Sequence, residues 1–467
     1  MQRVIVAGGG VGGLAAALAL GRAGHPVTVV EQDPLPATAD AEEAFTAERR
    51  GAPQVHQTHG FLARLQVVLR DRFPDVFDDL LAVGCTTMTG AADLGEPQPG
   101  DEDLKVLVVR RTTLEWVLRQ ATLRRPEVAF RTGVRVTGVA ADGATVTGVR
   151  LDDGTTLDAD LVVASTGRRG AVPAWLSDIG VDVPERVHES GLMYLTRWYR
   201  LPGAVDITTD PKLGGNLGFV KYLAVPGDAG TLSVTLAVRT DDADLRAALS
   251  DGDRFDEACR ILPGPDRFFR DGPLEPLGGV RPMAGLINRV RRFVDDAGEP
   301  TVLGFHAVGD AHTCTNPLYG RGCSLAFVQA VLLADTLADH PDDPAARARA
   351  YEAACRREIE PWFDMAVQMD EAGADPGSAG GNGADEQAGR TMAAVFVAAA
   401  TEPVLARAMA RLWNLLATPA DLMADGAFLA KVAEVVAEPD KYPPPPREGP
   451  SRRALLEALT VIGAARA

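Results

Sequence analysis

Residues 3–31 read RVIVAGGGVGGLAAALALGRAGHPVTVVE, and this stretch decides the fold. The apolar run 3–7 is typical of a buried parallel strand. A glycine-rich turn then leads into an Ala/Leu-rich helix expected over 14–22, and a second strand is expected over 27–30, directly before Glu31. The order strand, glycine turn, helix and strand predicts an α/β protein with a doubly wound, Rossmann-like parallel sheet.

The turn carries the G-x-G-x-x-G spacing at Gly8, Gly10 and Gly13. Gly8 permits the tight turn, Gly10 lets the backbone approach a pyrophosphate, and Gly13 lets helix and strand pack closely. The helix N-terminus directs free amide groups at phosphates, and Glu31 is placed to accept hydrogen bonds from a ribose. A glycine-rich turn of another α/β protein is the alternative, but the position between strand and helix favours a dinucleotide site. Glu31 disfavours a 2′-phosphate, which leaves NAD or FAD.

Composition limits the classes of partner. The chain has 467 residues, enough for a multidomain enzyme, and its 46% hydrophobic and 24% charged residues are ordinary for a globular protein. A net charge of −17 repels phosphate backbones, so we expect no nucleic-acid partner. Five cysteines without a CxxC pair fit a reducing compartment, and with a core strand beginning at Arg3 we expect no signal peptide. The sequence therefore predicts a cytoplasmic protein without stable membrane insertion.

Further strand ends carry glycine or charged residues. A strand expected over 104–110 runs into a helix start, Arg111-Thr112-Thr113-Leu114, and a buried strand, 160–164, is followed by STGRRG. Another strand, 301–308, ends in Gly309-Asp310, and the loop NPLYGRG, 316–322, opens a long helix. The N-terminus of that helix can stabilise negative charge. An ordinary turn with a capping aspartate is the alternative for Gly309-Asp310.

This order of segments resembles the flavoprotein monooxygenases of the hydroxybenzoate-hydroxylase type, from the glycine turn to Gly322. The resemblance implies FAD as cofactor, with NAD(P)H or a flavin reductase as the source of electrons. In that family a Gly-Asp pair holds the ribityl chain, the Pro and Gly residues that follow pack against the isoalloxazine, and an arginine at an R-x-x-L helix start contacts the flavin. The expected cofactor-binding residues are Gly8, Gly10, Gly13, Glu31, Arg50, Arg111, Gly309, Asp310, Pro317, Gly320 and Gly322.

Three segments resemble the flavin-dependent epoxidases of polyether antibiotic biosynthesis and their squalene-epoxidase-like relatives. They are RGAPQ at 50–54 with His59, TGRR at 166–169 with PAWL at 173–176, and YLTRWYR at 194–200. The broader hydroxylase class carries Asp-Gly where this chain has Thr166-Gly167, so the nicotinamide contact of that Asp is in doubt here, and with it the route of flavin reduction. The W-x-W-x-I-P signature of flavin halogenases is missing from the sequence.

Candidate residues of the reaction site are few. His59, Arg50 and Arg197 are the candidate catalytic residues, although oxygen transfer to an alkene requires no acid–base side chain. His56 and His59 lie three apart, but without a third ligand nearby we expect a polar pair and no metal site.

Aromatic residues of the β-rich segment 192–239 are the candidate substrate-binding residues: Tyr194, Trp198 and Tyr222. Alternation along a strand places Tyr194, Thr196 and Trp198 on one face, and Leu195, Arg197 and Tyr199 on the other. One face packs on a core and the other roofs the substrate cavity, but the sequence does not tell which.

The sequence predicts three parts. A discontinuous FAD-binding domain takes residues 1–185 plus 286–345, an inserted antiparallel β-sheet substrate domain takes 186–285, and a helical region takes 346–467.

Within the helical region we expect a flexible loop at 371–389, helices over 390–438 broken at Pro403 and Pro419, and an extended tail from Tyr442. We expect this region to cover the substrate cavity. Weak membrane contact is the alternative, although the region has no basic face.

The combined motifs predict an FAD-dependent monooxygenase that epoxidises or hydroxylates a hydrophobic biosynthetic intermediate, with O2 as co-substrate and a flavin C4a-hydroperoxide as oxygen donor. A flavin-dependent reductase of the geranylgeranyl-reductase type, which moves hydride without oxygen insertion, is the first alternative. A flavin-loaded binding protein without chemistry is the second.

Overall fold

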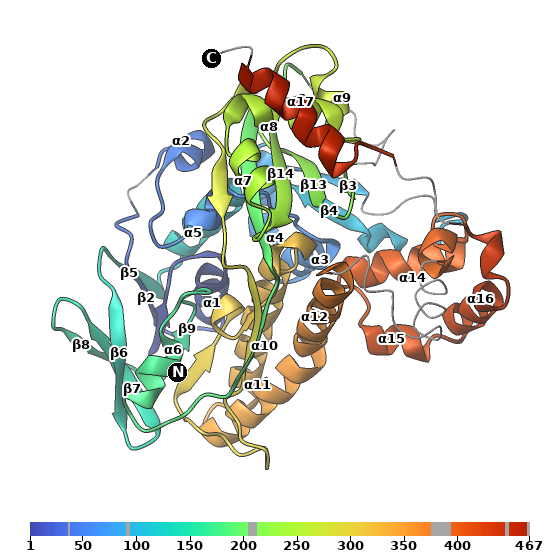
Figure 1. The fold of residues 1–467 in the computed structure, drawn as a ribbon. Helices are drawn as coiled ribbons and strands as arrows, with labels where there is room; N and C mark the ends of the chain where they lie inside the picture. Colours follow the sequence, from blue (N-terminus) through green and yellow to red (C-terminus); the bar gives the residue numbers. More distant parts are fainter. Residues whose placement is uncertain (36–37, 90–93, 204–212, 375–393, 444–447, 465–467) are drawn as a thin grey trace.

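The computed structural model describes the chain apart from residues 36–37, 90–93, 204–212, 375–393, 444–447 and 465–467. Its central sheet has five parallel strands in the order β18–β9–β1–β2–β5 (Figure 1). β1 is the middle strand, so the glycine turn that follows it lies at the centre of the carboxyl edge, and the predicted fold class is confirmed. The strands are β1 (Val4–Ala7), β2 (Val27–Glu31), β5 (Val128–Thr132), β9 (Leu161–Ala164) and β18 (Phe305–Ala307).

Helices cover one face of this sheet and form the largest core with it. α1 packs against α5 and α10. By length and composition α10 is apolar enough to cross a membrane, but 67% of it is buried inside the protein, where it forms the centre of this layer. The helices of the layer are α1 (Val11–Arg22), α3 (Ala63–Arg72), α4 (Pro74–Ala82), α5 (Arg111–Leu123) and α10 (Gly322–Asp339).

The opposite face packs against a small antiparallel sheet and α6, with Val149, Trp175 and Phe305 in the shared core. This sheet comprises β6 (Val136–Asp142), β7 (Thr145–Leu151) and β8 (Thr156–Asp158), and α6 spans Val172–Ser177. A second three-stranded sheet, in the order β10–β17–β19, carries the chain back to the central sheet. Its strands are β10 (Glu185–Glu189), β17 (Ile287–Arg291) and β19 (Thr313–Cys314).

The larger antiparallel sheet has the order β12–β13–β14–β11–β15, and β16 also pairs with β11. One face packs against α7, α8 and α17, which Figure 1 shows across the top of the molecule. The elements are β11 (Leu192–Arg200), β12 (Gly214–Asn216), β13 (Val220–Gly227), β14 (Thr231–Arg239), β15 (Glu275–Pro276), β16 (Arg281–Met283), α7 (Ala243–Leu249), α8 (Gly252–Ile261) and α9 (Asp266–Phe269).

Shorter elements connect these layers. They are α2 (Ala41–Thr46), the 3-10 turns η1 (Pro53–His56), η2 (Asp101–Asp103), η3 (Gly309–Ala311) and η4 (Pro317–Tyr319), and the two-stranded ribbon β3 (Thr86–Thr89) with β4 (Lys105–Val108).

The C-terminal region is helical, as predicted, with Pro403 and Pro419 each at the first position of a helix. α11 and α12 run beside α10, and α14 to α16 form a lobe at one side (Figure 1). Its elements are α11 (Pro344–Glu358), α12 (Glu360–Ala374), α14 (Pro403–Trp413), α15 (Pro419–Ala424), α16 (Gly426–Ala437), η5 (Pro439–Lys441) and α17 (Arg452–Ala464).

Two expectations for this region need correction. α12 continues to Ala374, into the segment expected to be a loop, while 375–389 of that segment lies outside the described residues. The tail after Tyr442 is not extended throughout, because Leu455 and Leu459, four residues apart, place one face of helix α17 in the core beside α8. The proline run obscured that helical period in the sequence.

A buried ion pair joins the two larger layers. The Arg110 guanidinium and the Asp228 carboxylate approach to 2.8 Å with side chains only 1% and 2% exposed. Asp228 also accepts hydrogen bonds from the Arg110 amide (2.6 Å) and the Thr113 hydroxyl (2.7 Å), and Glu42 pairs with the same guanidinium. A buried charge without its partner is strongly unfavourable, so this contact fixes α5 against the β13–β14 turn.

We expect Asp228→Ala to lower the free energy of unfolding by about 3 kcal/mol, because Arg110 keeps only Glu42 as a partner. Urea denaturation followed by circular dichroism measures the loss. Asp241→Ala is the control, since its ion pair with Arg239 is half exposed and worth at most about 1 kcal/mol. Equal losses in the two variants would contradict the role of the buried pair.

Candidate functional site

The glycine turn has the geometry expected from its spacing. Gly8 has φ +113°, and a Cβ there would lie 2.4 Å from the Ser165 carbonyl oxygen. A Cβ at Gly13 would lie 1.8 Å from the Gly8 carbonyl oxygen, so only glycine allows α1 to approach β1 this closely. A Cβ at Gly10 would meet no protein atom within 4 Å. The packing therefore requires Gly8 and Gly13, whereas the space beside Gly10 is open to a ligand.

Glu31 is held rigidly at the end of β2. Its side chain is buried and accepts hydrogen bonds from the Gly9 amide (2.6 Å) and the Asp33 amide (2.9 Å). A carboxylate has about four acceptor positions, so two bonds fix its orientation and leave capacity for the hydroxyl groups of a ribose.

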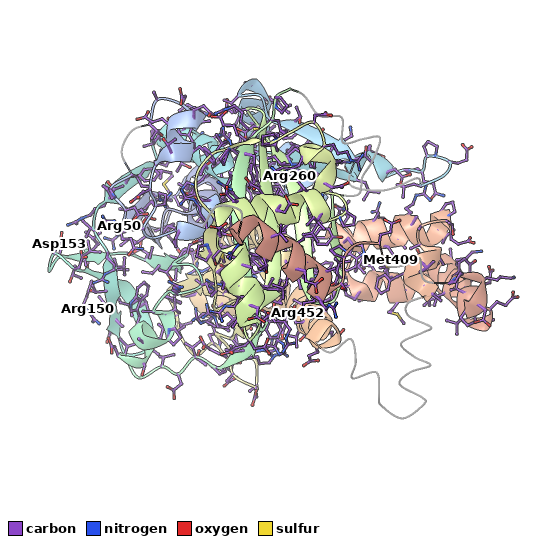
Figure 2. All side chains as sticks on the ribbon, turned by 45° about the horizontal axis from the view of Figure 1, so that its top comes forward. Arg50, Arg150, Asp153, Arg260, Met409 and Arg452 are labelled. Carbon is purple, nitrogen blue, oxygen red and sulfur yellow. The ribbon has the colours of Figure 1, made fainter. Side chains whose placement is uncertain are left out.

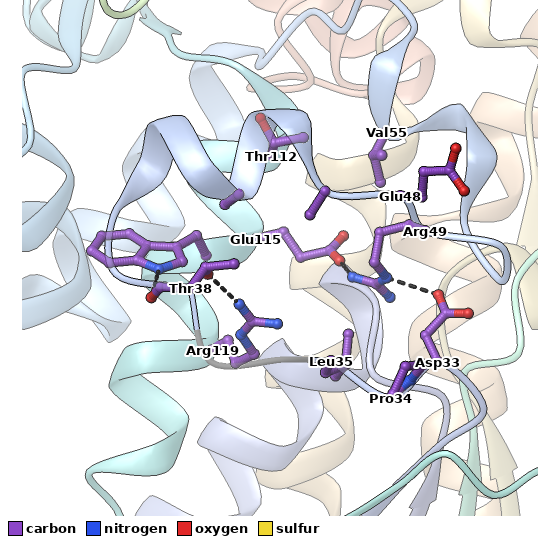
Figure 3. A pocket seen from close by; sticks show the side chains of 13 residues that line it. Asp33, Pro34, Leu35, Thr38, Glu48, Arg49, Val55, Thr112, Glu115 and Arg119 are labelled. Atoms are coloured by element: carbon purple, nitrogen blue, oxygen red, sulfur yellow. Dashed lines mark hydrogen bonds and ion pairs between the residues drawn. The ribbon is translucent and has the colours of Figure 1, made fainter.

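Arg49, which no sequence motif indicated, lies beside this carboxylate. Figure 3 shows its guanidinium between Asp33 and Glu115. Its guanidinium lies 2.9 Å from Asp33 and 3.7 Å from Glu31, and it also pairs with Glu115. Asp33, Arg49 and Glu115 line a small pocket of about 50 Å³ between the loop after β2 and α5, where Arg119 donates a 2.9 Å hydrogen bond to Thr38. No sequence motif indicates Arg49, because its partners lie in two segments far apart in the chain, the end of β2 and α5.

Arg50, the expected cofactor-binding and candidate catalytic residue, is exposed and labelled in Figure 2. Within the described part of the chain, no side chain pairs with it. The structure thus turns Arg49, and not Arg50, toward the carboxylates around Glu31.

The second edge of the site is the turn after β18. Gly309 has φ +66°, and its amide donates to the Gln329 side chain at 2.7 Å. Burial raises the pKa of the Asp310 carboxyl, and the charges of Arg111, Arg168 and Arg289 oppose that rise. The expected residues Arg111 and Asp310 are therefore brought close together, although they lie far apart in the chain.

Several buried polar atoms on these elements have no partner in the described structure. They are Arg111 Nε, Arg168 Nη1, Arg289 Nε, Thr315 Oγ1 and Ser324 Oγ. Buried donors without partners are costly, and a polar ligand supplies the missing acceptors. This observation and the open space beside Gly10 fit a ligand that carries phosphates and hydroxyl groups.

His59 forms a hydrogen bond with Arg111. The His59 Nδ1–H donates to the Gln57 carbonyl oxygen (2.9 Å), and Nε2 accepts from the Arg111 guanidinium (3.2 Å). Burial, and then the charge of Arg111, lower the pKa of His59 to about 3. His59 is therefore neutral at physiological pH and positions Arg111 without exchanging a proton.

The loop 316–322 passes directly in front of His59. Pro317 begins η4, Gly320 has φ +66°, and a Cβ at Gly320 would lie 3.3 Å from Gly60. α10 begins at Gly322, near the Asp310 carboxylate. The loop glycines thus allow two backbone segments to touch beside the start of a long helix.

β11 alternates as predicted and turns one face to this loop. The Tyr194 hydroxyl donates to Asn316 Oδ1 (2.6 Å), Thr196 contacts Gln57 (2.7 Å), and the Trp198 indole N–H donates to the His56 carbonyl (2.7 Å). Tyr194 and Trp198 therefore lie on the same face of β11, Tyr194 against the loop and Trp198 against the segment that carries His56.

Two candidates lie on the opposite face. Arg197 pairs with Asp256 at 2.7 Å beside α8, so it does not reach the site as a catalytic residue. Tyr222 stands opposite Leu236 and is buried in the core behind the sheet, so it does not line the cavity. The strand register sets the orientation of both side chains, and this register could not be predicted from the sequence.

The two histidines, expected to be a polar pair, contact different groups. The His56 ring packs against Phe45, burial lowers the pKa of His56, and the described residues contain no cluster of metal-ligating side chains.

Comparisons with known proteins identify the ligand. Residues 1–197 match the family described as FAD binding domain. This part of the chain is therefore similar to FAD-binding domains. The expected cofactor is thereby confirmed, and the protein is a flavoprotein oxidoreductase.

Several proteins similar to this flavoprotein are named as monooxygenases or epoxidases. A kynurenine 3-monooxygenase of Salinispora arenicola is 26% identical over 401 residues, which cover 78% of this chain and 79% of that protein. A chloroplastic zeaxanthin epoxidase of Oryza sativa subsp. japonica is 30% identical over 180 residues, 35% of this chain and 25% of that protein. Among solved structures, the p-nitrophenol 4-monooxygenase PnpA of Pseudomonas putida DLL-E4 shares the fold, with a TM-score of 0.62 at 19% identity over 90% of this flavoprotein and 99% of PnpA.

The depressed pKa of His59 predicts a pH dependence of stability. Above pH 6.5 His59 is neutral in both the folded and the unfolded state. As the pH falls from 6.5 toward 3, only the unfolded state binds a proton, so stability is lost over this range. Between pH 8 and pH 5 we expect the flavoprotein to lose about 2 kcal/mol more than its His59→Gln variant, by urea denaturation at each pH. Parallel losses would show that His59 titrates normally.

Proposed function

We propose that this flavoprotein is an FAD-dependent monooxygenase that inserts one oxygen atom into a hydrophobic small molecule, using O2. The observation that carries this proposal is the contact between the site-facing side of β11 and loop 316–322, directly beside the partnerless polar atoms around Asp310. A substrate resting on that face of the sheet would lie next to the flavin ring.

The site supports a specific assignment of the cofactor. Gly10 would leave room for the pyrophosphate, with Gly8 and Gly13 required for the turn and the close packing of α1. Glu31 would accept from the adenosine ribose, and Asp310 from the ribityl chain. Arg111, held by His59, would donate to the flavin, and the N-terminus of α10 would stabilise negative charge on the ring. Pro317, Gly320 and Gly322 would pack against the ring, and Arg49 would hold Glu31 in place.

The sheet supplies an apolar surface for the substrate. Where it meets the loop, it presents the cluster Tyr194, Ala237 and Leu286, bordered by Leu192, Met283 and Leu318. Reduced FAD supplies the activated oxygen when it is bound. The chain's own residues orient an apolar molecule, exclude water and donate hydrogen bonds from Arg111.

For the substrate we propose an alkene-containing or aromatic biosynthetic intermediate, with epoxidation of the polyether type as the reaction that the motifs at 50–54, 166–169 and 194–200 favour. The partial match to a zeaxanthin epoxidase supports the same choice. NAD(P)H or a flavin reductase supplies the electrons. A reductase of the geranylgeranyl-reductase type is the second candidate, since Thr166-Gly167 stands where the hydroxylases carry Asp-Gly.

An anaerobic titration tests this proposal first. We expect the purified protein to show flavin absorption that bleaches with NADPH, with NADH or with a flavin reductase. Incubation with alkene substrates under labelled O2 should then give a product with one labelled oxygen atom, by mass spectrometry. A product heavier by two hydrogens and without oxygen would favour the reductase, and a protein that cannot hold flavin would overturn the proposal.

Gly10→Val is a direct test of the cofactor position. Because the space beside Gly10 contains no protein atom within 4 Å, the variant should fold normally while its branched side chain blocks the pyrophosphate. We expect the ratio of visible to ultraviolet absorption to show little bound FAD, with an unchanged far-ultraviolet circular dichroism spectrum. Gly279→Val, also at a glycine with open space around its Cβ, is the control. Full FAD occupancy in Gly10→Val would contradict the assignment.

A further inference from the structure

One carboxylate from the C-terminal region, that of Asp370, is buried against residues of the loop 316–322. Asp370, near the end of α12, is only 5% exposed. Its Oδ1 accepts hydrogen bonds from Asn316 Nδ2 (2.8 Å) and the Tyr319 hydroxyl (2.7 Å), and its Oδ2 accepts from Asn288 Nδ2 (2.7 Å). Both asparagines are completely buried.

The same network reaches the substrate face. The backbone N–H of Asn316 donates to Asn288 Oδ1 (2.6 Å), and Asn316 Oδ1 accepts from the Tyr194 hydroxyl (2.6 Å). The side-chain amides of Asn316 and Asn288 therefore each have one defined orientation. Exchanging the oxygen and nitrogen of either amide would break its hydrogen bonds on both sides. Asp370 thus ties β11 of the substrate sheet and β17 to the loop 316–322.

α12 also holds the far end of that loop. Arg321 is fully buried, and its guanidinium donates to the Trp362 carbonyl oxygen (3.2 Å) and contacts the Met365 sulfur (3.3 Å). The ring of Trp362 lies 5.3 Å from the same guanidinium. In Figure 1 α12 runs beside α10, the helix that the loop opens. Helix α12 therefore contacts the loop at both ends. From the sequence we expected the C-terminal region to cover the cavity, and its contact with this loop was not predicted.

We propose that Asp370 is a positioning residue that fixes the loop 316–322 against the flavin and the substrate sheet. The inference rests on the proposed function, since it assigns to this network the placement of the loop that packs on the FAD ring. A buried carboxylate suits this task because it accepts several hydrogen bonds at once and donates none. An amide at this position would direct its own N–H group at Asn288 Nδ2, which also donates.

The test compares the holoenzyme with Asp370→Asn and Asp370→Ala. We expect the dissociation constant of FAD to rise at least about tenfold, the equivalent of one charge-assisted hydrogen bond. We also expect the visible circular dichroism of bound flavin to change, because the loop no longer holds the ring in one orientation. Asp364→Asn is the matched control, since Asp364 lies on the same helix and pairs with Arg186 at the surface.

Tyr319→Phe keeps the test decisive if the Asp370 variants do not fold. It removes one of the three donors and little volume, so we expect the same two changes at a smaller size, about threefold in affinity. Wild-type values of both FAD affinity and flavin dichroism in Tyr319→Phe and in every Asp370 variant that folds would overturn the inference, even if thermal stability fell. A wild-type protein unable to bind FAD would instead remove the proposed function itself, so the two failures are distinct.

Discussion

The close contact between α1 and the turn after β1 is the constraint on which the rest of the structure depends. No side chain fits at Gly13, because its Cβ would lie 1.8 Å from the Gly8 carbonyl oxygen. Packed this closely, α1 presents an Ala/Leu surface to α10. α10 in turn carries the loop 316–322 to the same edge of the sheet as the glycine turn. Two segments far apart in the sequence therefore lie at one edge of the sheet, beside one pair of packed helices.

Arginines connect the layers of this acidic protein. Arg49 joins the carboxylates at the end of β2 to α5, and Arg110 joins α5 to the β13–β14 turn. Arg321 joins the loop 316–322 to α12. A guanidinium remains charged when buried and presents several donors in one plane, so it bridges elements that a lysine would not hold in register. The charge of the chain as a whole is negative, yet cations make these three buried contacts between its layers.

The proposed reaction site is the surface between the larger antiparallel sheet and the loop 316–322. Strand alternation sends Tyr194, Thr196 and Trp198 toward that surface and sends Arg197 into an ion pair behind the sheet. His59 is neutral and serves as an acceptor for Arg111, so the protein's part in the proposed chemistry is to hold and orient groups. Asp370 extends this organisation to the C-terminal helices, which hold the loop from its outer side.

The sequence by itself determined the parallel sheet, the glycine turn, Glu31 and the Gly309-Asp310 turn, because these depend on local backbone geometry and short spacings. It also predicted the alternation along β11, which is a property of any strand. Only the tertiary structure decided that Arg49 and not Arg50 faces Glu31. It also decided that Tyr222 and Arg197 lie behind the sheet, and that Asp370 binds the loop 316–322. Those outcomes depend on strand register and on contacts between distant segments, which no local pattern records.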